Sequence, residues 1–224
     1  MTEMAHGTVL VQSGEAVLPR WWRTVDRGTI GCILALFAIG LLLGFAASPP
    51  LAERNGHPPF HYVTRQAFFG GMAMIGMLLV SMMPPHLVRR FAVVGFGAAF
   101  LSLLLLPIFG TDFGQGAVRW YSLGFASVQP SEFLKPLYMV TVAWMVAASQ
   151  ELAGPPGKRL SFALTLVIVG VLAMQPDFGQ AALILMAWCV IYFVAGAPII
   201  LLMGVLALSG VAGVFFYNAS EHFA

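Results

Sequence analysis

The sequence predicts an all-α integral membrane protein, a polytopic helical bundle with seven transmembrane helices. Hydrophobic residues make up 59% of the chain and charged residues only 9%, and the mean hydropathy is +0.88. Soluble domains carry charge on about 25% of their residues, so this composition belongs to membrane proteins. Apolar stretches of about 20 residues, the length that crosses the hydrocarbon core, recur along the chain. The formal net charge of +2, without any block of like charges, argues against a nucleic-acid partner.

The first three predicted spans are long apolar runs without internal charges. Residues 28–47 follow a polar tail, residues 1–27, which is long for the start of a signal peptide, so we expect an uncleaved first helix. The second span covers residues 66–83 and ends before a pair of prolines. The third covers residues 91–109.

The last three spans follow a short polar connection. The fifth, residues 160–175, is short and ends where a Pro-Asp pair interrupts the apolar run. Residues 178–220 carry no charge over 43 positions, too many for one crossing at about 1.5 Å per residue. A Gly-Ala-Pro turn at 196–198 is expected to divide them into two spans. The membrane portion would then be residues 28–217, and residues 218–224 would begin the next loop.

Counts of Lys and Arg in the connecting segments predict the orientation. Alternate segments, beginning with the tail, hold seven: Arg20, Arg23, Arg27, Arg89, Arg90, Lys158 and Arg159. The opposite segments hold four: Arg54, Arg65, Arg119 and Lys135. The excess favours a cytoplasmic N-terminus, and seven spans would then put the C-terminus outside.

The fourth span, residues 130–149, is unusual because charges lie in its first turns. The preceding stretch and the helix start read GAVRWYSLGFASVQPSEFLKP, residues 116–136. Pro130 suits the first position of a helix, where its missing N–H is not needed. Glu132 would lie near the positive end of the helix dipole. Lys135, three residues later, lies on the same face and can pair with Glu132.

A second segment repeats this pattern on the same predicted side. Gln129-Pro130 is echoed by Gln175-Pro176-Asp177, and the tetrapeptide Asp-Phe-Gly-Gln occurs at 112–115 and at 177–180. One end of the bundle would therefore gather charges from distant parts of the chain, namely Asp112, Arg119, Glu132, Lys135 and Asp177.

Spacing alone leaves two interpretations of this charged end open. Charges within a span persist if they pair or face a wet cavity, so they could be interfacial anchors with an ion pair that fixes helix packing. Alternatively, they line an outward-facing cavity for an anionic, lipid-linked substrate. Arg119 and Lys135 would then contact phosphates, while Glu132 and Asp177 would position those cations or a sugar. Trp120 fits an interfacial aromatic belt.

Three motifs carry a family resemblance: GAVRW at 116–120, QPSEFLKP at 129–136 and QPDFGQA at 175–181. They resemble the SEDS family of FtsW, RodA and SpoVE, and WWRTVDR at 21–27 is similar to the alphaproteobacterial FtsW type. Val118 departs from the pattern, because the family commonly has two adjacent arginines before the Trp.

The resemblance implies a ten-helix protein of the bacterial inner membrane that polymerises lipid II into glycan strands at the division septum. It implies that Arg119, Trp120, Gln129, Glu132, Lys135 and Asp177 bind this substrate. It assigns no catalytic residue here, because the family's essential loop aspartate would lie beyond Ala224, and the chain looks like the N-terminal part of such a protein. The implied partners are lipid II, membrane lipid, a class B penicillin-binding transpeptidase and other divisome proteins. No cofactor is implied with certainty, although a divalent cation is compatible with the family.

Two other functions remain as alternatives: a transporter (flippase) of the polyprenyl-linked precursor, and a divisome scaffold. A scaffold has no need for charges within a span, and a transporter needs polar groups across the whole bilayer. The charges here cluster at one end, which favours the enzyme.

Other features predict little chemistry. Cys32 and Cys189 lie in apolar runs, which argues against a disulfide or a thiolate metal site. The prolines between His57 and His61 prevent a shared helix face, so a metal site there is not expected. The Trp21-Trp22 pair among arginines fits an interfacial stretch or a disordered tail.

Overall fold

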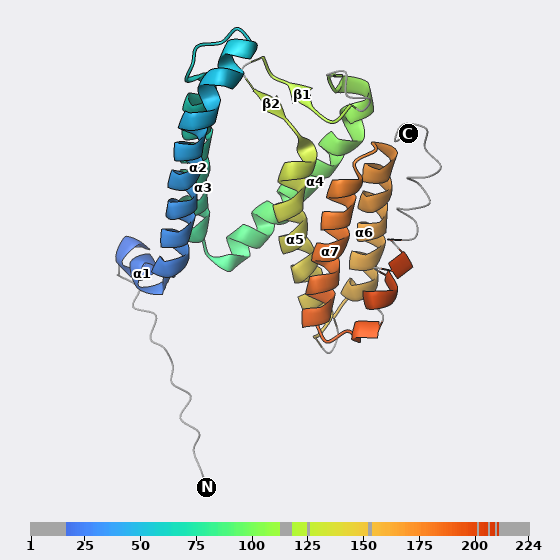
Figure 1. The fold of residues 1–224 in the computed structure, drawn as a ribbon. Helices are drawn as coiled ribbons and strands as arrows, with labels where there is room; N and C mark the ends of the chain where they lie inside the picture. The colour runs from blue at the N-terminus through green and yellow to red at the C-terminus, as the bar shows by residue number, and fades with distance from the viewer. Residues whose placement is uncertain are drawn as a thin grey trace. The chain divides into compact units, whose positions relative to one another are not determined.

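The structure, a computed structural model, describes residues 17–112, 118–124, 126–151, 154–200, 202–205, 207, 208 and 210. It consists of two compact units, Met1–Pro84 and Pro85–Ala224. The described residues are almost all helical, apart from one short hairpin (Figure 1). The predicted all-α fold is therefore confirmed.

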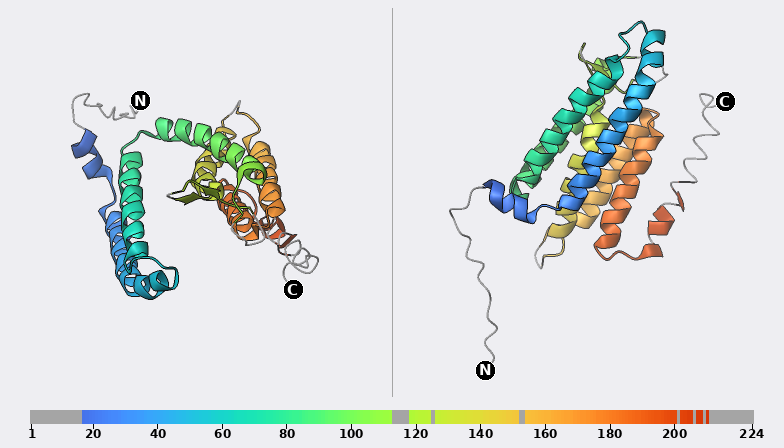
Figure 2. Two further views of the ribbon diagram at one scale, coloured as in Figure 1. Left: turned by 90° about the horizontal axis from the view of Figure 1, so that it is seen from above. Right: turned by 60° about the vertical axis from the view of Figure 1, so that its left-hand side comes forward.

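The first unit contains three helices, α1 (Val17–Thr24), α2 (Arg27–Arg54) and α3 (His61–Ser81). The two long helices, α2 and α3, lie side by side in both views of Figure 2. The ring of Phe37 lies over Gly70, where an added Cβ would be only 2.2 Å from it.

Helix α2 is longer than the predicted first span, because it continues beyond residue 47 through Pro49 and Pro50 to Arg54. Each proline removes one backbone donor, yet tertiary contacts hold the last turns in helical form. Ser48 is buried, and its hydroxyl donates to the carbonyl oxygen of Pro59 at 2.8 Å. The loop before α3 thus binds the end of α2, which the local sequence does not reveal.

The Trp21-Trp22 pair lies in a helix, α1, rather than in an irregular tail. Trp21 donates its indole N–H to the hydroxyl of Ser81 at 2.9 Å, which attaches α1 to the end of α3. Asp26 then caps α2 by accepting from the backbone N–H of Gly28 at 2.9 Å. The guanidinium of Arg27 lies over the Trp22 ring, 5.1 Å from its centroid. Trp22 remains half exposed, as an interfacial helix requires.

The second unit is a helical bundle with a β-hairpin at one end. Its helix α5 packs against α4, α6 and α7, and α6 packs against α7. The elements are α4 (Pro85–Phe109), β1 (Tyr121–Ser122), β2 (Ser127–Val128), α5 (Pro130–Ala148), α6 (Gly157–Met174) and α7 (Phe178–Val194).

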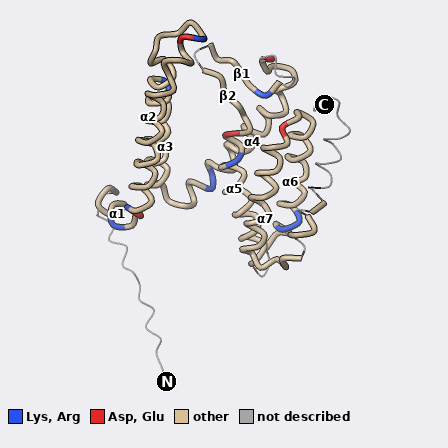
Figure 3. The backbone as a smooth tube through the Cα atoms, in the orientation of Figure 1, with Lys and Arg blue, Asp and Glu red and all other residues tan. Residues whose placement is uncertain are grey.

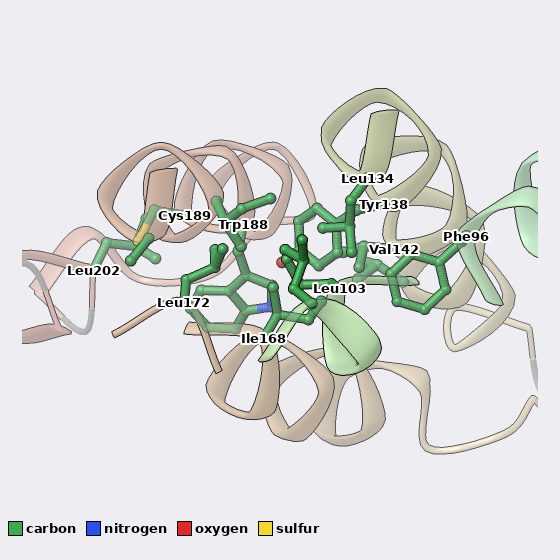
Figure 4. Packing of buried hydrophobic residues seen from close by; sticks show 14 residues of the cluster. Phe96, Leu103, Leu134, Tyr138, Val142, Ile168, Leu172, Trp188, Cys189 and Leu202 are labelled. Carbon is green, nitrogen blue, oxygen red and sulfur yellow. The ribbon is translucent and has the colours of Figure 1, made fainter. Parts of the chain in front are cut away.

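The core of this bundle is apolar with a few paired polar groups (Figure 4). The Tyr138 hydroxyl lies 2.6 Å from that of Thr165, and the Trp188 indole donates to Ser161 at 3.3 Å. Buried groups of this kind must pair, because an unpaired one loses its hydration without replacement. The buried apolar side chains shown in the figure include Phe96, Leu103, Leu134, Val142, Ile168, Leu172, Cys189 and Leu202.

Charges in both units lie mainly toward helix ends, and the middles of the long helices are free of them (Figure 3). Among the described residues, four helices are long and apolar enough to cross a membrane: α2, α3, α4 and α6. Helix α7 is apolar but has 17 residues, and α5 carries its charges in the first turns. Helices α2 to α7 correspond to the first six predicted spans. The seventh lies largely outside the described residues, although residues 202–205 are helical.

Candidate functional site

The hairpin leads from the end of α4 into α5. The Thr111 N–H donates to the Trp120 carbonyl at 2.9 Å, so the chain returns alongside the end of α4. Tyr121 then pairs with Val128 across the two strands. The turn contains Gly124 at φ +81°, a conformation that side chains with a Cβ disfavour. Trp120, half-buried, is thereby held beside α4 through its backbone.

The start of α5 is as predicted, with Gln129 before the helix and Pro130 in its first turn. Glu132 makes two polar contacts at this helix start. One carboxylate oxygen lies 2.7 Å from Nζ of Lys135, and the other accepts from Nε2 of Gln180 on α7, also at 2.7 Å. The predicted ion pair is therefore confirmed, and an amide from a second helix completes it.

This ion pair lies at the surface of the bundle. The Glu132 side chain is 49% exposed and that of Lys135 is 25% exposed. A deeply buried pair would cost much desolvation energy, whereas a half-exposed one costs little and remains accessible. An ammonium group has three donors and the salt bridge with Glu132 uses one, so Lys135 keeps donors for an anion.

The turn between α6 and α7 brings two further predicted residues to the same end. Arg119 donates from Nη2 to the carbonyl oxygen of Pro176 at 3.0 Å. Gln129 donates from Nε2 to Oδ2 of Asp177 at 3.2 Å. Asp177 is 9% exposed, so its carboxylate is largely shielded from solvent. The second Gln-Pro segment thus contacts both the loop and the helix start of the first, in agreement with the predicted common side.

Three buried polar atoms of the described residues have no hydrogen-bond partner in the protein: Nε of Arg119, Oγ of Ser131 and Oε1 of Gln180. All three residues belong to the segments that form this site. Buried polar atoms in folded proteins are nearly always paired with protein or water. Hydrogen-bonding capacity that the protein itself leaves unused is thus concentrated in these segments.

Clusters of metal-ligating side chains are not seen in the part of the chain that the structure describes. No group of three or more His, Cys, Asp or Glu side chains gathers among the described residues. Both oxygens of Glu132 already bind Lys135 and Gln180, and the rings of His57 and His61 stack on each other at 4.4 Å between centroids. The donor set at the site suits an anion better than a metal.

Some members of the site were missed by the sequence prediction. Gln180 belongs to a repeated tetrapeptide but was not predicted as a site residue. It lies three residues after Asp177, so Asp177 and Gln180 lie on one side of the start of α7. Ser131, 3% exposed, gave no signal beyond its position between Pro130 and Glu132. Asp112 was grouped with the site; it is exposed, next to the Thr111 bridge.

Comparison with known proteins gives one consistent relationship. The sequence model of the FtsW/RodA/SpoVE family, described as cell cycle proteins, matches residues 27–223. A protein of Caulobacter vibrioides described as a probable peptidoglycan glycosyltransferase FtsW is 37% identical over 214 residues. The aligned region covers 94% of this chain and 55% of the length of the Caulobacter protein. A protein of Allochromatium vinosum with the same description is 34% identical, covering 83% and 47%. This chain therefore spans about half the length of these relatives.

Solved structures agree with the sequence comparison. The rod-shape-determining protein RodA of Thermus thermophilus superposes with a TM-score of 0.69 at 27% identity, over 85% of this chain and 60% of RodA. A chain of a peptidoglycan synthase complex, studied for the coordination of polymerization and crosslinking, gives a TM-score of 0.68 at 27% identity, over 90% and 57%. With helices long and apolar enough to span a bilayer, the chain is a multi-pass membrane protein, and it belongs to the FtsW/RodA/SpoVE family.

Proposed function

We propose that this chain forms the substrate-binding half of an FtsW-type peptidoglycan glycosyltransferase, which polymerises lipid II. The observation that carries the proposal is the cluster at one end of the second unit, where Arg119, Gln129, Glu132, Lys135 and Asp177 are brought together. Their contacts with the α6–α7 turn and with Gln180 support it. The proposed reaction is taken from the relatives, which are described as probable peptidoglycan glycosyltransferases.

The chemistry of the cluster suits a lipid-linked diphosphate sugar. Lys135 supplies a point charge for a phosphate, and Arg119 supplies a planar set of N–H donors. Its hydrogen bond to Pro176 uses one of the five N–H groups of the guanidinium. Glu132 holds Lys135 in place through their ion pair. Both of its carboxylate oxygens are occupied by donors, which makes Glu132 a poor general base. We assign no residue of this chain as the base of glycosyl transfer.

Membrane placement follows from the same charges. The site lies at the end of the bundle opposite Lys158 and Arg159, which lie in the first turn of α6. The excess of basic residues on that side supports a cytoplasmic N-terminus and a periplasmic site in the inner membrane. Helix α1, with arginines and a half-exposed Trp22, suits the cytoplasmic interface. Localisation at the division septum is proposed from the FtsW relatives.

The proposed protein partner is a class B penicillin-binding transpeptidase. The similar chain from a peptidoglycan synthase complex, in which polymerization and crosslinking are coordinated, supports it. A transporter is less well supported, because the middles of α2, α3, α6 and α7 carry no charge to accompany a polar headgroup across the bilayer.

The test is polymerisation of labelled lipid II by a purified protein. That protein is the product of the longest open reading frame that contains these residues, and it is purified together with its transpeptidase. Arg119→Ala is expected to weaken lipid II use about tenfold, the loss of roughly one charged hydrogen bond, without lowering the protein level. Arg159→Ala is the matched control, because Arg159 is exposed at the opposite end of the bundle. Equal activity of the Arg119→Ala variant and the control would overturn the assignment of Arg119.

A further inference from the structure

Helix α4 contains a proline whose consequences reach the site. In an α-helix the N–H of residue i donates to the carbonyl of residue i−4. Pro107 has no N–H, so the carbonyl of Leu103 lacks its usual i→i−4 donor. Leu103 is 1% exposed. Its carbonyl needs a hydrogen-bond donor from elsewhere in the protein.

That donor is the side chain of Gln175, which reaches across from the end of α6. Its Nε2 lies 2.9 Å from the carbonyl oxygen of Leu103, and the contact is buried. Gln175 itself is 9% exposed. The amide of one helix end therefore replaces the backbone N–H that Pro107 lacks.

A second side chain binds the neighbouring carbonyl of the same helix. The Tyr121 hydroxyl donates to the carbonyl oxygen of Ser102 at 2.7 Å. Tyr121 comes two residues after Arg119, and Gln175 comes directly before Pro176, the residue whose carbonyl Arg119 contacts. Both partners of the Arg119–Pro176 hydrogen bond are thus attached to consecutive carbonyls of α4.

We propose that Gln175 is a positioning residue for substrate binding: by bonding the Leu103 carbonyl, it fixes the α6–α7 turn so that Pro176 orients Arg119 and Asp177 receives Gln129. The proposal rests on the proposed function for its substrate, but the attachment itself does not. The Gln175 amide binds Leu103 of α4, outside the set of residues proposed to contact the substrate. Its effect is therefore exerted through the turn.

The alternative is a purely structural role, in which Gln175 only satisfies a buried carbonyl. A second substitution separates the two roles. Pro107→Ala restores a backbone N–H for Leu103, so it removes the need for the Gln175 donor within α4. It does not restore the connection from α4 to the turn.

The experiment compares Gln175→Leu, Pro107→Ala and the double variant in the purified protein. Thermal unfolding measures stability, hydrogen–deuterium exchange of residues 172–180 measures the turn, and titration with lipid II in nanodiscs measures binding. Gln150→Leu is the matched control, because its amide also donates to a carbonyl, that of Ala195 at 3.3 Å, at the other end of the bundle.

We expect Gln175→Leu to lower the unfolding temperature, speed exchange in the turn and weaken lipid II binding about tenfold, as loss of an oriented charged contact does. The double variant should regain the stability while exchange and binding stay impaired. Recovery of all three quantities, or no change of exchange and binding in Gln175→Leu, would overturn the positioning role. If Gln175→Leu does not fold, the double variant alone decides between these outcomes. If the unaltered protein binds no lipid II, the proposed function fails, and exchange in the turn still decides whether Gln175 holds it.

Discussion

Replacing Gln180 by glutamate would put a second carboxylate against Glu132 between α5 and α7. The amide and the carboxylate are now 2.7 Å apart. Two unit charges at that distance repel by about 1.5 kcal/mol in water and by about 6 kcal/mol at an effective dielectric constant of 20. Glu132 is half exposed, so the side chains can separate to about 5 Å. There the range falls to about 0.8–3 kcal/mol, and we expect a loss of about 1–3 kcal/mol.

Two further variants isolate this repulsion. Gln180→Leu removes the hydrogen bond without adding a charge, so its stability differs from that of Gln180→Glu by the repulsion alone. Combining Gln180→Glu with Glu132→Gln leaves one carboxylate and one amide between the same helices. The combined variant should therefore recover most of the stability, a coupling that a double-mutant cycle measures.

The assay is equilibrium unfolding of the purified protein in mild detergent, followed by circular dichroism. Equal stability of Gln180→Glu and Gln180→Leu would refute the reasoning, since it would mean that the side chains at 132 and 180 do not meet. Failure of the combined variant to recover would likewise contradict the contact.

Two other predictions concern stability and pH. Gly157→Ala should destabilise the second unit by about 1–3 kcal/mol or more, because a Cβ at Gly157 would lie 1.8 Å from the Met145 carbonyl oxygen; thermal unfolding against Gly170→Ala, where the added carbon would meet nothing within 4 Å, checks this. The Thr29 hydroxyl, followed by the Gly28 N–H, holds the pKa of Asp26 below its ordinary value of 3.8, so the capping contribution of Asp26 is present above that value and is lost as pH falls through the lower folded pKa. The protection of amides at the start of α2, measured as their exchange rate relative to the unprotected rate at the same pH, should fall across that acidic window, and an Asp26→Asn variant should not show this fall.

Much of the fold could be predicted because the bilayer imposes simple rules on sequence. Apolar runs correspond to helices α2 to α7, with charges in the first turns of α5 alone among the predicted runs, and Pro130 marks the start of α5 as expected. The pairing of Glu132 with Lys135 also follows from spacing within one helix. Local spacing does not determine where a helix continues past prolines, so the sequence did not indicate that α2 extends to Arg54.

The contacts between segments could not be predicted, since they depend on which helices pack together. Gln180 reaches Glu132 across 48 positions and Gln175 reaches Leu103 across 72. The repeated Gln-Pro pattern indicated that two segments share a side. It did not indicate that the glutamine of the second one replaces a donor missing at Pro107. To predict the hydrogen bond from Gln175 to Leu103, one must already know that α4 packs beside the α6–α7 turn.

The central claim is that the polar end of the second unit binds the headgroup of lipid II, and photocrosslinking tests it most directly. A photoreactive phenylalanine analogue replaces either Phe133, which follows Glu132 and is 58% exposed, or Phe193, which is 52% exposed near the other end of α7. With radiolabelled lipid II in nanodiscs, the analogue at position 133 should give a crosslink that unlabelled lipid II displaces and that Lys135→Ala weakens. The analogue at position 193 should give none that unlabelled lipid II displaces. Equal labelling at both positions, unaffected by Lys135→Ala, would contradict the claim.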